Sequence, residues 1–110
     1  MRILLDECLP KDLARKLPGH RVKTVPQAGW ASISNGKLLR LIADSGQFDV
    51  FLTVDQRLPQ QNKTSLLPFA TVVLRAQSNR RVHVLPFAAE SLRRRSEFQP
   101  GHVYLLSQPE

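Results

Sequence analysis

Two short apolar runs that each end in an aspartate constrain the fold of this chain most. Residues 2–5 read Arg-Ile-Leu-Leu and precede Asp6, and residues 50–54 read Val-Phe-Leu-Thr-Val and precede Asp55. Apolar runs of this length, rich in branched and aromatic side chains, are typical of buried strands in a parallel sheet. We therefore expect two interior strands, each with a carboxylate at its carboxyl end.

Strands and helices alternate along the rest of the sequence. Further strands are expected at 22–25, 71–74 and 102–106, helices at 10–17, 35–44 and 80–96, and a loop or short helix within 56–68. In the last helix, the side chains expected to face inward are Leu85, Ala88, Ala89 and Leu92. This order predicts an α/β fold, with a mostly parallel sheet covered by helices on both faces. The length suits a single domain, residues 1–110.

Composition narrows the compartment and the class of partner. No apolar run reaches the roughly 18 residues of a membrane span, and acids interrupt the N-terminal apolar stretch, so we expect no membrane contact and no signal peptide. The single cysteine, Cys8, fits a reducing cytoplasm. Lysine and arginine total 16 against 9 acidic residues, a formal net charge of +7. This charge favours a polyanionic partner, above all nucleic acid, over a merely solvated basic face.

The residues that follow the two interior strands form the candidate site. In parallel sheets, ligands bind outside the carboxyl ends of the strands, where Asp6, Glu7 and Asp55 meet if the strands are neighbours. Clustered carboxylates raise each other's pKa, and a bound Mg²⁺ or Mn²⁺ removes that cost. The alternative is that each aspartate caps a following helix. Asp49 begins its strand at the opposite end and is not expected in the site.

Three segments carry a resemblance to a known family: LLDECLP at 4–10, GWASISNGKLLRLI at 29–42 and LTVDQRLPQQN at 52–62. Together they resemble the PIN-like domain family, in particular its small toxin-type nucleases. The resemblance implies a three-layer α/β/α sandwich that cuts RNA with Mg²⁺ or Mn²⁺. It also implies a small antitoxin protein as partner, and it allows a homodimer.

The same resemblance assigns roles to individual residues. Asp6 and Asp55 match acids that bind the metal, and Glu7 is implied as a ligand or as a residue that supports the ligands. Asn35 stands at the start of the middle helix, where relatives often have an acid, and Arg57 stands two residues after Asp55, where many have a second acid. Asn35 can still offer an amide oxygen to a metal or a water, and Arg57 can hold a phosphate.

Other polar residues are candidates for contact with RNA. Gln61 and Asn62 can line the same edge and contact bases, or they form a polar surface turn. Arg80 and Arg81, together with the arginine run at 93–95, can follow a phosphate backbone, or they form a solvated helix face.

Three further residues have an ordinary structural interpretation. Thr53 lies two positions before Asp55 and can point to the same side, although a strand threonine packed in the core is the default expectation. Trp30 is expected to be a partly buried anchor in its loop. Cys8 has no base or cation nearby in the sequence, so we do not expect a catalytic thiol.

The residues leave three classes of function open. The first is a metal-dependent ribonuclease acting through Asp6 and Asp55, with Glu7 and Asn35 assisting. The second is a PIN-like module that binds RNA or a protein without cutting. The third is a receiver-like domain phosphorylated on Asp55; it needs a lysine after a late strand, and the sequence has no lysine after Lys63.

Overall fold

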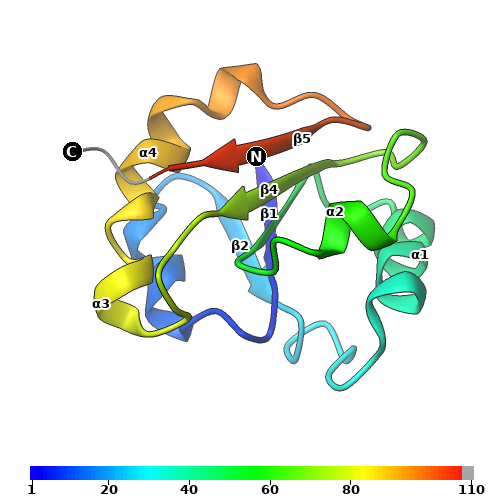
Figure 1. Cartoon of the computed structure of the whole chain (residues 1–110), viewed down its shortest axis with the longest axis horizontal. Helices are drawn as coiled ribbons and strands as arrows, with labels where there is room; N and C mark the ends of the chain where they lie inside the picture. Colours follow the sequence, from blue (N-terminus) through cyan, green and yellow to red (C-terminus); the bar gives the residue numbers. More distant parts are fainter. Residues whose placement is uncertain (108–110) are drawn as a thin grey trace.

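A five-stranded parallel sheet forms the centre of the molecule in the computed structural model, which describes residues 1–107 (Figure 1). The spatial order of the strands is β2-β1-β3-β4-β5. Their bounds are β1 Arg2–Leu5, β2 Arg21–Thr24, β3 Val50–Thr53, β4 Ala70–Leu74 and β5 Val103–Leu106. Every paired neighbour runs in parallel, which confirms the α/β fold class expected from the sequence.

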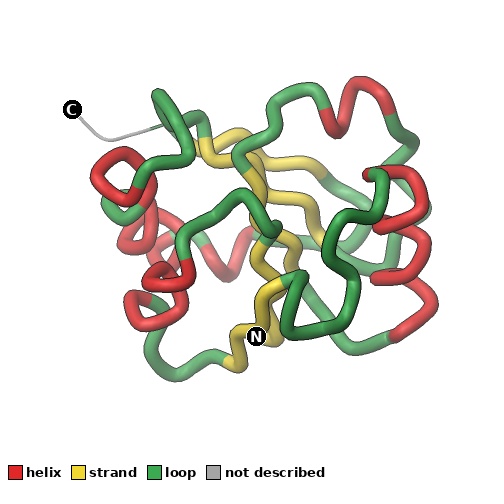
Figure 2. Tube along the Cα trace, turned by 90° about the horizontal axis from the view of Figure 1, so that it is seen from below, coloured by secondary structure: helices red, strands yellow, loops and turns green. Residues whose placement is uncertain are grey.

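Helices cover both faces of this sheet. Figure 2 shows the strands as a middle layer with helical segments on either side. The α-helices are α1 Asn35–Ser45, α2 Leu58–Gln61, α3 Arg81–Val84 and α4 Phe87–Arg93, and two 3₁₀ segments are η1 Lys11–Lys16 and η2 Arg95–Glu97. Among the described residues, no helix has the length and apolar character needed to cross a membrane.

The alternation of side chains along each strand divides the core in two. On one face, Leu5 and Leu52 pack with Leu13 of η1 and Phe87 of α4. On the other face, strand residues pack against α1 and the loop before it, in a cluster that includes Leu4, Phe51, Leu38, Leu39 and Ile42. Because both faces are buried, the interior strands β1 and β3 are apolar except for Arg2 at the exposed start of β1 and Thr53 at the end of β3.

Two expectations about the helices are wrong. The single helix expected over 80–96 is divided into α3, α4 and η2, because Pro86 has no backbone N–H to continue the hydrogen-bond ladder. After this break, Ala89 is exposed, whereas Ala88 is buried. The helix expected at 10–17 is the 3₁₀ segment η1, although Leu13 and Leu17 are buried as expected.

The strand order creates a topological switch point between β1 and β3. The chain moves outward from β1 to β2 and then returns to place β3 on the other side of β1. The connections that follow β1 and β3 therefore leave in opposite directions across the sheet, and ligands of parallel α/β proteins bind at such a point. Asp6 and Asp55 come directly after these two strands and flank this point.

Candidate functional site

Asp6 is buried at the carboxyl end of β1. Its backbone N–H donates to the carbonyl oxygen of Leu52 at 2.9 Å, which extends the pairing of β1 with β3 by one residue. The carboxylate Oδ1 accepts a hydrogen bond from the backbone N–H of Glu7 at 2.8 Å. Oδ2 accepts one from the hydroxyl of Thr53 at 2.7 Å. Only 8% of Asp6 is exposed, so the side chain is held in one orientation by neutral donors.

Thr53 links the two strand ends. Its Oγ1 donates to Asp6 and also accepts the backbone N–H of Asp55 at 3.0 Å. The residue is fully buried at the last position of β3. Sequence reasoning treated Thr53 as a core threonine by default; it is buried, but its hydroxyl belongs to the site. The only signal in the sequence was its spacing of two from Asp55, which places both on one side of an extended chain.

Asp55 lies half-buried beside this network. Its Oδ2 accepts a hydrogen bond from Nδ2 of Asn35 at 3.1 Å, and its Oδ1 accepts one from the backbone N–H of Arg57 at 3.0 Å. Asn35 is the first residue of α1, which the strand order places against the same part of the sheet. The structure thus brings Asp6, Thr53, Asp55 and Asn35 into one continuous hydrogen-bonded chain.

In the described part of the chain, no basic side chain forms an ion pair with the carboxylate of Asp6. Burial raises its pKa, and the hydrogen bonds from Thr53 and Glu7 oppose the rise only in part. Within residues 1–107, the basic side chains that form ion pairs do so with other acids. Cys8 is close enough for burial and the negative charge of Asp6 to raise the pKa of its thiol to about 11. A thiol with that pKa is protonated at neutral pH, in line with the expectation that Cys8 is not a nucleophile.

The donors in this chain suit a hard divalent cation. Each of the four carboxylate oxygens of Asp6 and Asp55 accepts one hydrogen bond, which leaves further lone pairs, and the amide of Asn35 adds a fifth oxygen. Mg²⁺ is typically held by one or two carboxylates plus waters and substrate phosphates. Among the described residues, no three His, Cys, Asp or Glu side chains gather as a metal site. The residues therefore fit a cation that is coordinated largely by water.

Glu7 is not gathered with the two aspartates. Its carboxylate accepts hydrogen bonds from the backbone N–H of Ser32, at 3.0 Å to Oε1 and 3.3 Å to Oε2. Ser32 has a φ of 62° in the loop before α1, a left-handed conformation that is uncommon for serine. Glu7 thus ties this loop to the end of β1.

The residues expected to contact RNA are spread around this edge. The side chains of Arg57 and Gln61 are exposed, at the start and the end of α2. Asn62 donates from Nδ2 to the carbonyl oxygen of Leu58 at 2.9 Å, so it closes the end of α2. Arg80 is exposed before α3, whereas Arg81 forms an ion pair with Asp12 of η1.

Two other expectations have a clear outcome. Arg93 and Arg94 form ion pairs with Glu90 and Glu97, three residues away along the chain, so these arginines are partly neutralised. Trp30 is partly buried, and its ring meets the ring of Phe48 edge to face at 6.1 Å between centroids, as expected of an anchor.

Comparisons of this chain with protein-family models, with curated proteins and with solved structures found no match. Membership of the PIN-like family therefore stays a prediction from the three segments quoted above. The carboxylates at the ends of β1 and β3, the hydroxyl between them and the amide beside them are independent of that resemblance.

Proposed function

We propose that this protein is a metal-dependent ribonuclease of the PIN-like type, which hydrolyses phosphodiester bonds where β1 and β3 end. The observation that carries the proposal is the hydrogen-bonded chain from Asp6 through Thr53 to Asp55 and Asn35. The carboxylates of Asp6 and Asp55 follow adjacent strands and belong to one hydrogen-bonded chain, without an ion-pairing basic side chain in the described part of the molecule. A buried carboxylate without a counter-charge attracts a divalent cation, because the cation offsets the cost of burial.

The residues of the site would divide the work as follows. Asp6 and Asp55 hold Mg²⁺ or Mn²⁺, which when bound neutralises charge on a phosphoryl oxygen and lowers the pKa of bound water. Thr53 is a positioning residue, because its hydroxyl fixes Asp6 and the backbone of Asp55 together. Asn35 orients Asp55 through Nδ2 and offers Oδ1 to the cation or to a water. Glu7 keeps the loop before α1 in place.

The charge of the chain supports RNA as the substrate. A net charge of +7 draws in a polyanion, although the catalytic edge itself carries carboxylates. Arg57 and Arg80 are exposed near the ends of β3 and β4, where a phosphate on either side of the scissile bond can reach them. Gln61 offers a neutral amide to a base. Asn62 is less available, since its amide is engaged with Leu58.

A second candidate is a PIN-like module that binds RNA or a protein without cutting. It is favoured by the small number of carboxylates, since Asn35 and Arg57 occupy positions where an acid would strengthen the metal site. The receiver-like alternative gains from Asp55 lying after β3 beside Asp6, but no lysine follows Lys63 to pair with a phosphoryl group.

A groove on the face of the sheet that η1, α3 and α4 cover supports a protein partner. We propose that this partner is a small acidic antitoxin. The groove has a volume of about 720 Å³ and lies between η1 and the helices α3 and α4. Its lining includes the apolar residues Val82, which is 66% exposed, and Leu85, and the basic residues Arg15 and Lys16. An amphipathic helix with acidic flanks matches this arrangement of charge. Light scattering of the chain alone and with its partner checks both this complex and a homodimer.

The deciding experiment is an RNA cleavage assay. Labelled RNAs of varied sequence are incubated with the protein and Mg²⁺ or Mn²⁺, with EDTA as the metal-free arm. We expect cleavage that EDTA and Asp6→Asn abolish and that Asp49→Asn, a matched change at the other end of the same strands, leaves intact. No cleavage and no divalent binding by folded protein would contradict the nuclease and favour the binding module.

A further inference from the structure

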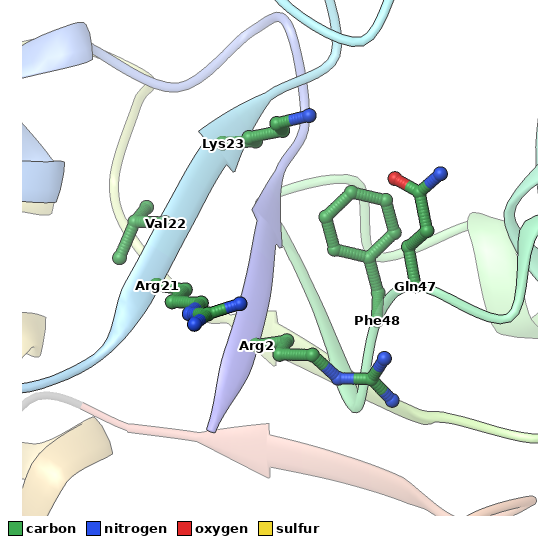
Figure 3. A pocket seen from close by; sticks show the side chains of 6 residues that line it. All are labelled: Arg2, Arg21, Val22, Lys23, Gln47 and Phe48. Atoms are coloured by element: carbon green, nitrogen blue, oxygen red, sulfur yellow. The ribbon is translucent and has the colours of Figure 1, made fainter.

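A hollow with a strongly basic lining lies at the opposite edge of the sheet from the carboxylates. It has a volume of about 520 Å³ and is formed by β1, β2 and the turn before β3. Figure 3 shows the side chains that surround it, which are Arg2, Arg21, Val22, Lys23, Gln47 and Phe48. Among the described residues, three basic side chains and no carboxylate line the hollow.

Two of these cations are free to bind an anion. Arg21 and Lys23 alternate with Val22 along β2, so both project from the same face of this edge strand. Both residues are exposed, and within residues 1–107 neither forms an ion pair. Arg2 differs, because its guanidinium donates to Asp49 and to the carbonyl oxygen of Gly46. Arg2 is therefore held in place and neutralised by Asp49, and Arg21 and Lys23 supply the net positive charge of the hollow.

The remaining lining is suited to a nucleobase. Phe48 borders the hollow with 7% of its surface exposed, and its ring packs edge to face against Trp30. The amide of Gln47 is exposed beside it and offers both a donor and an acceptor. Cations that hold phosphates next to an aromatic surface are the recurring elements of single-strand binding sites.

We propose that this hollow binds single-stranded nucleic acid, with backbone phosphates on Arg21 and Lys23 and a base against Phe48. The cations also give the strand a direction. Lys23 pairs in register with Leu4, and Asp6 lies two residues farther along β1, about 7 Å along the strand axis. A strand held along β2 therefore leads toward the carboxylate edge. That direction rests on the proposed function, whereas binding in the hollow does not.

The test measures binding where cleavage cannot occur. A fluorescein-labelled single-stranded 12-mer of uridine is titrated with protein in EDTA, and anisotropy is followed at several salt concentrations. For Arg21→Gln/Lys23→Gln we expect Kd to rise about tenfold at moderate salt, and the slope of log K against log salt to shrink by about 1.4, the value for two phosphates on a single strand. Circular dichroism confirms that each variant is folded.

A matched control variant distinguishes binding in the hollow from attraction by the overall positive charge of the protein. Lys37→Gln/Arg40→Gln removes the same charge from exposed residues of α1 that do not line the hollow, and should change Kd less than twofold. Arg21→Lys keeps the charge and should bind within about twofold of the parent. An equal loss in both double variants, or no binding by the parent protein, would overturn the proposal.

The same variants distinguish this proposal from the nuclease. If binding in EDTA depends on Arg21 and Lys23 but no metal-dependent cleavage is found, the hollow stands as a binding site and the nuclease fails. If cleavage occurs and Arg21→Gln/Lys23→Gln leaves its KM unchanged, the nuclease stands and the hollow fails. A KM that rises with kcat unchanged supports both, because it marks lost binding that the transition state and the bound substrate share.

Discussion

Asp49 lies at the amino end of the strand pair β1 and β3, and Asp6 lies at its carboxyl end. The two aspartates differ in exposure, in hydrogen-bond partners and in the direction of their pKa shifts. At the amino end, Asp49 is about half exposed and forms an ion pair with Arg2 at 3.1 Å, and this hydrogen-bonded partner lowers its pKa. At the carboxyl end, Asp6 is buried, has only neutral donors, and has its pKa raised by burial. The first arrangement supplies its own cation and the second does not.

This difference separates an aspartate that forms a surface ion pair, Asp49, from one that is buried without a counter-charge, Asp6. An exposed ion pair contributes up to about 1 kcal/mol to stability and can be lost cheaply. A buried carboxylate without a counter-charge lowers stability at neutral pH, and proteins retain such groups mainly where function needs them. The comparison therefore points to Asp6, and not to Asp49, as the group that a divalent cation would complete.

The largest expected effect is on catalysis. Asp6→Asn and Asp55→Asn should each slow RNA cleavage by about 100-fold or more, roughly 2.7 kcal/mol of activation free energy. The double variant should be little slower than either single variant if both carboxylates hold one cation, as proposed. Single-turnover rates in Mg²⁺ measure this. Additive losses would mean that the two aspartates act independently.

The next largest effect is expected from removing the Thr53 hydroxyl, which links the ends of β1 and β3. Thr53→Val keeps the shape but removes the hydroxyl, so Asp6 Oδ2 and the backbone N–H of Asp55 each lose a partner. We expect the free energy of unfolding to fall by about 1–3 kcal/mol and Mg²⁺ binding to weaken. Urea unfolding and calorimetric titration are the measurements. Thr53→Ser is the control, since it should preserve Mg²⁺ affinity; equal weakening in both variants would argue against the hydroxyl.

A smaller effect is expected at the amino end. Asp49→Asn removes the partner of Arg2 but leaves an oxygen that can accept its backbone N–H. The free energy of unfolding should fall by less than about 1 kcal/mol, and less still in high salt, because the pair is exposed. Urea unfolding at two salt concentrations checks this. A loss as large as that of Thr53→Val would remove the contrast between the two ends.

The smallest effect is the movement of two titration curves. In carboxyl-detected NMR, Asp6 should titrate above its ordinary pKa of 3.8 and Asp49 below it. The signs for stability follow from this. Asp6 stabilises the folded state fully below pH 3.8, and this stabilisation is lost as the pH rises through its folded pKa. Asp49 stabilises the folded state above pH 3.8, and this stabilisation is lost as the pH falls through its folded pKa. Added Mg²⁺ should lower the midpoint of Asp6 and leave that of Asp49 unchanged.

Much of this fold could be predicted from local sequence. The strands were found because runs such as 50–54 are apolar and bounded by turn residues, and the expected parallel sheet is confirmed. The division of the segment 80–96 was less visible. Pro86 signals a break, but which side chains turn inward afterwards depends on packing against η1 and the sheet, so Ala89 was misplaced.

The site could be predicted only in part. Asp6 and Asp55 were found because a general rule places ligands at strand ends. The role of Thr53 depends on the register that pairs Leu5 with Leu52, which local sequence does not specify. The contact of Glu7 with Ser32 depends on a left-handed backbone at a serine, which no propensity favours.

The all-parallel pairing of the strands also sets when the site can exist during folding. Parallel neighbours cannot be joined by a hairpin, so each pairing waits for a long connection to close. The hydrogen bond from Thr53 to Asp6 joins residues 47 positions apart. A nascent chain on the ribosome therefore carries the first aspartate long before its partner strand emerges. The carboxylate pair assembles only with the central strands, so an incompletely synthesised chain lacks the site.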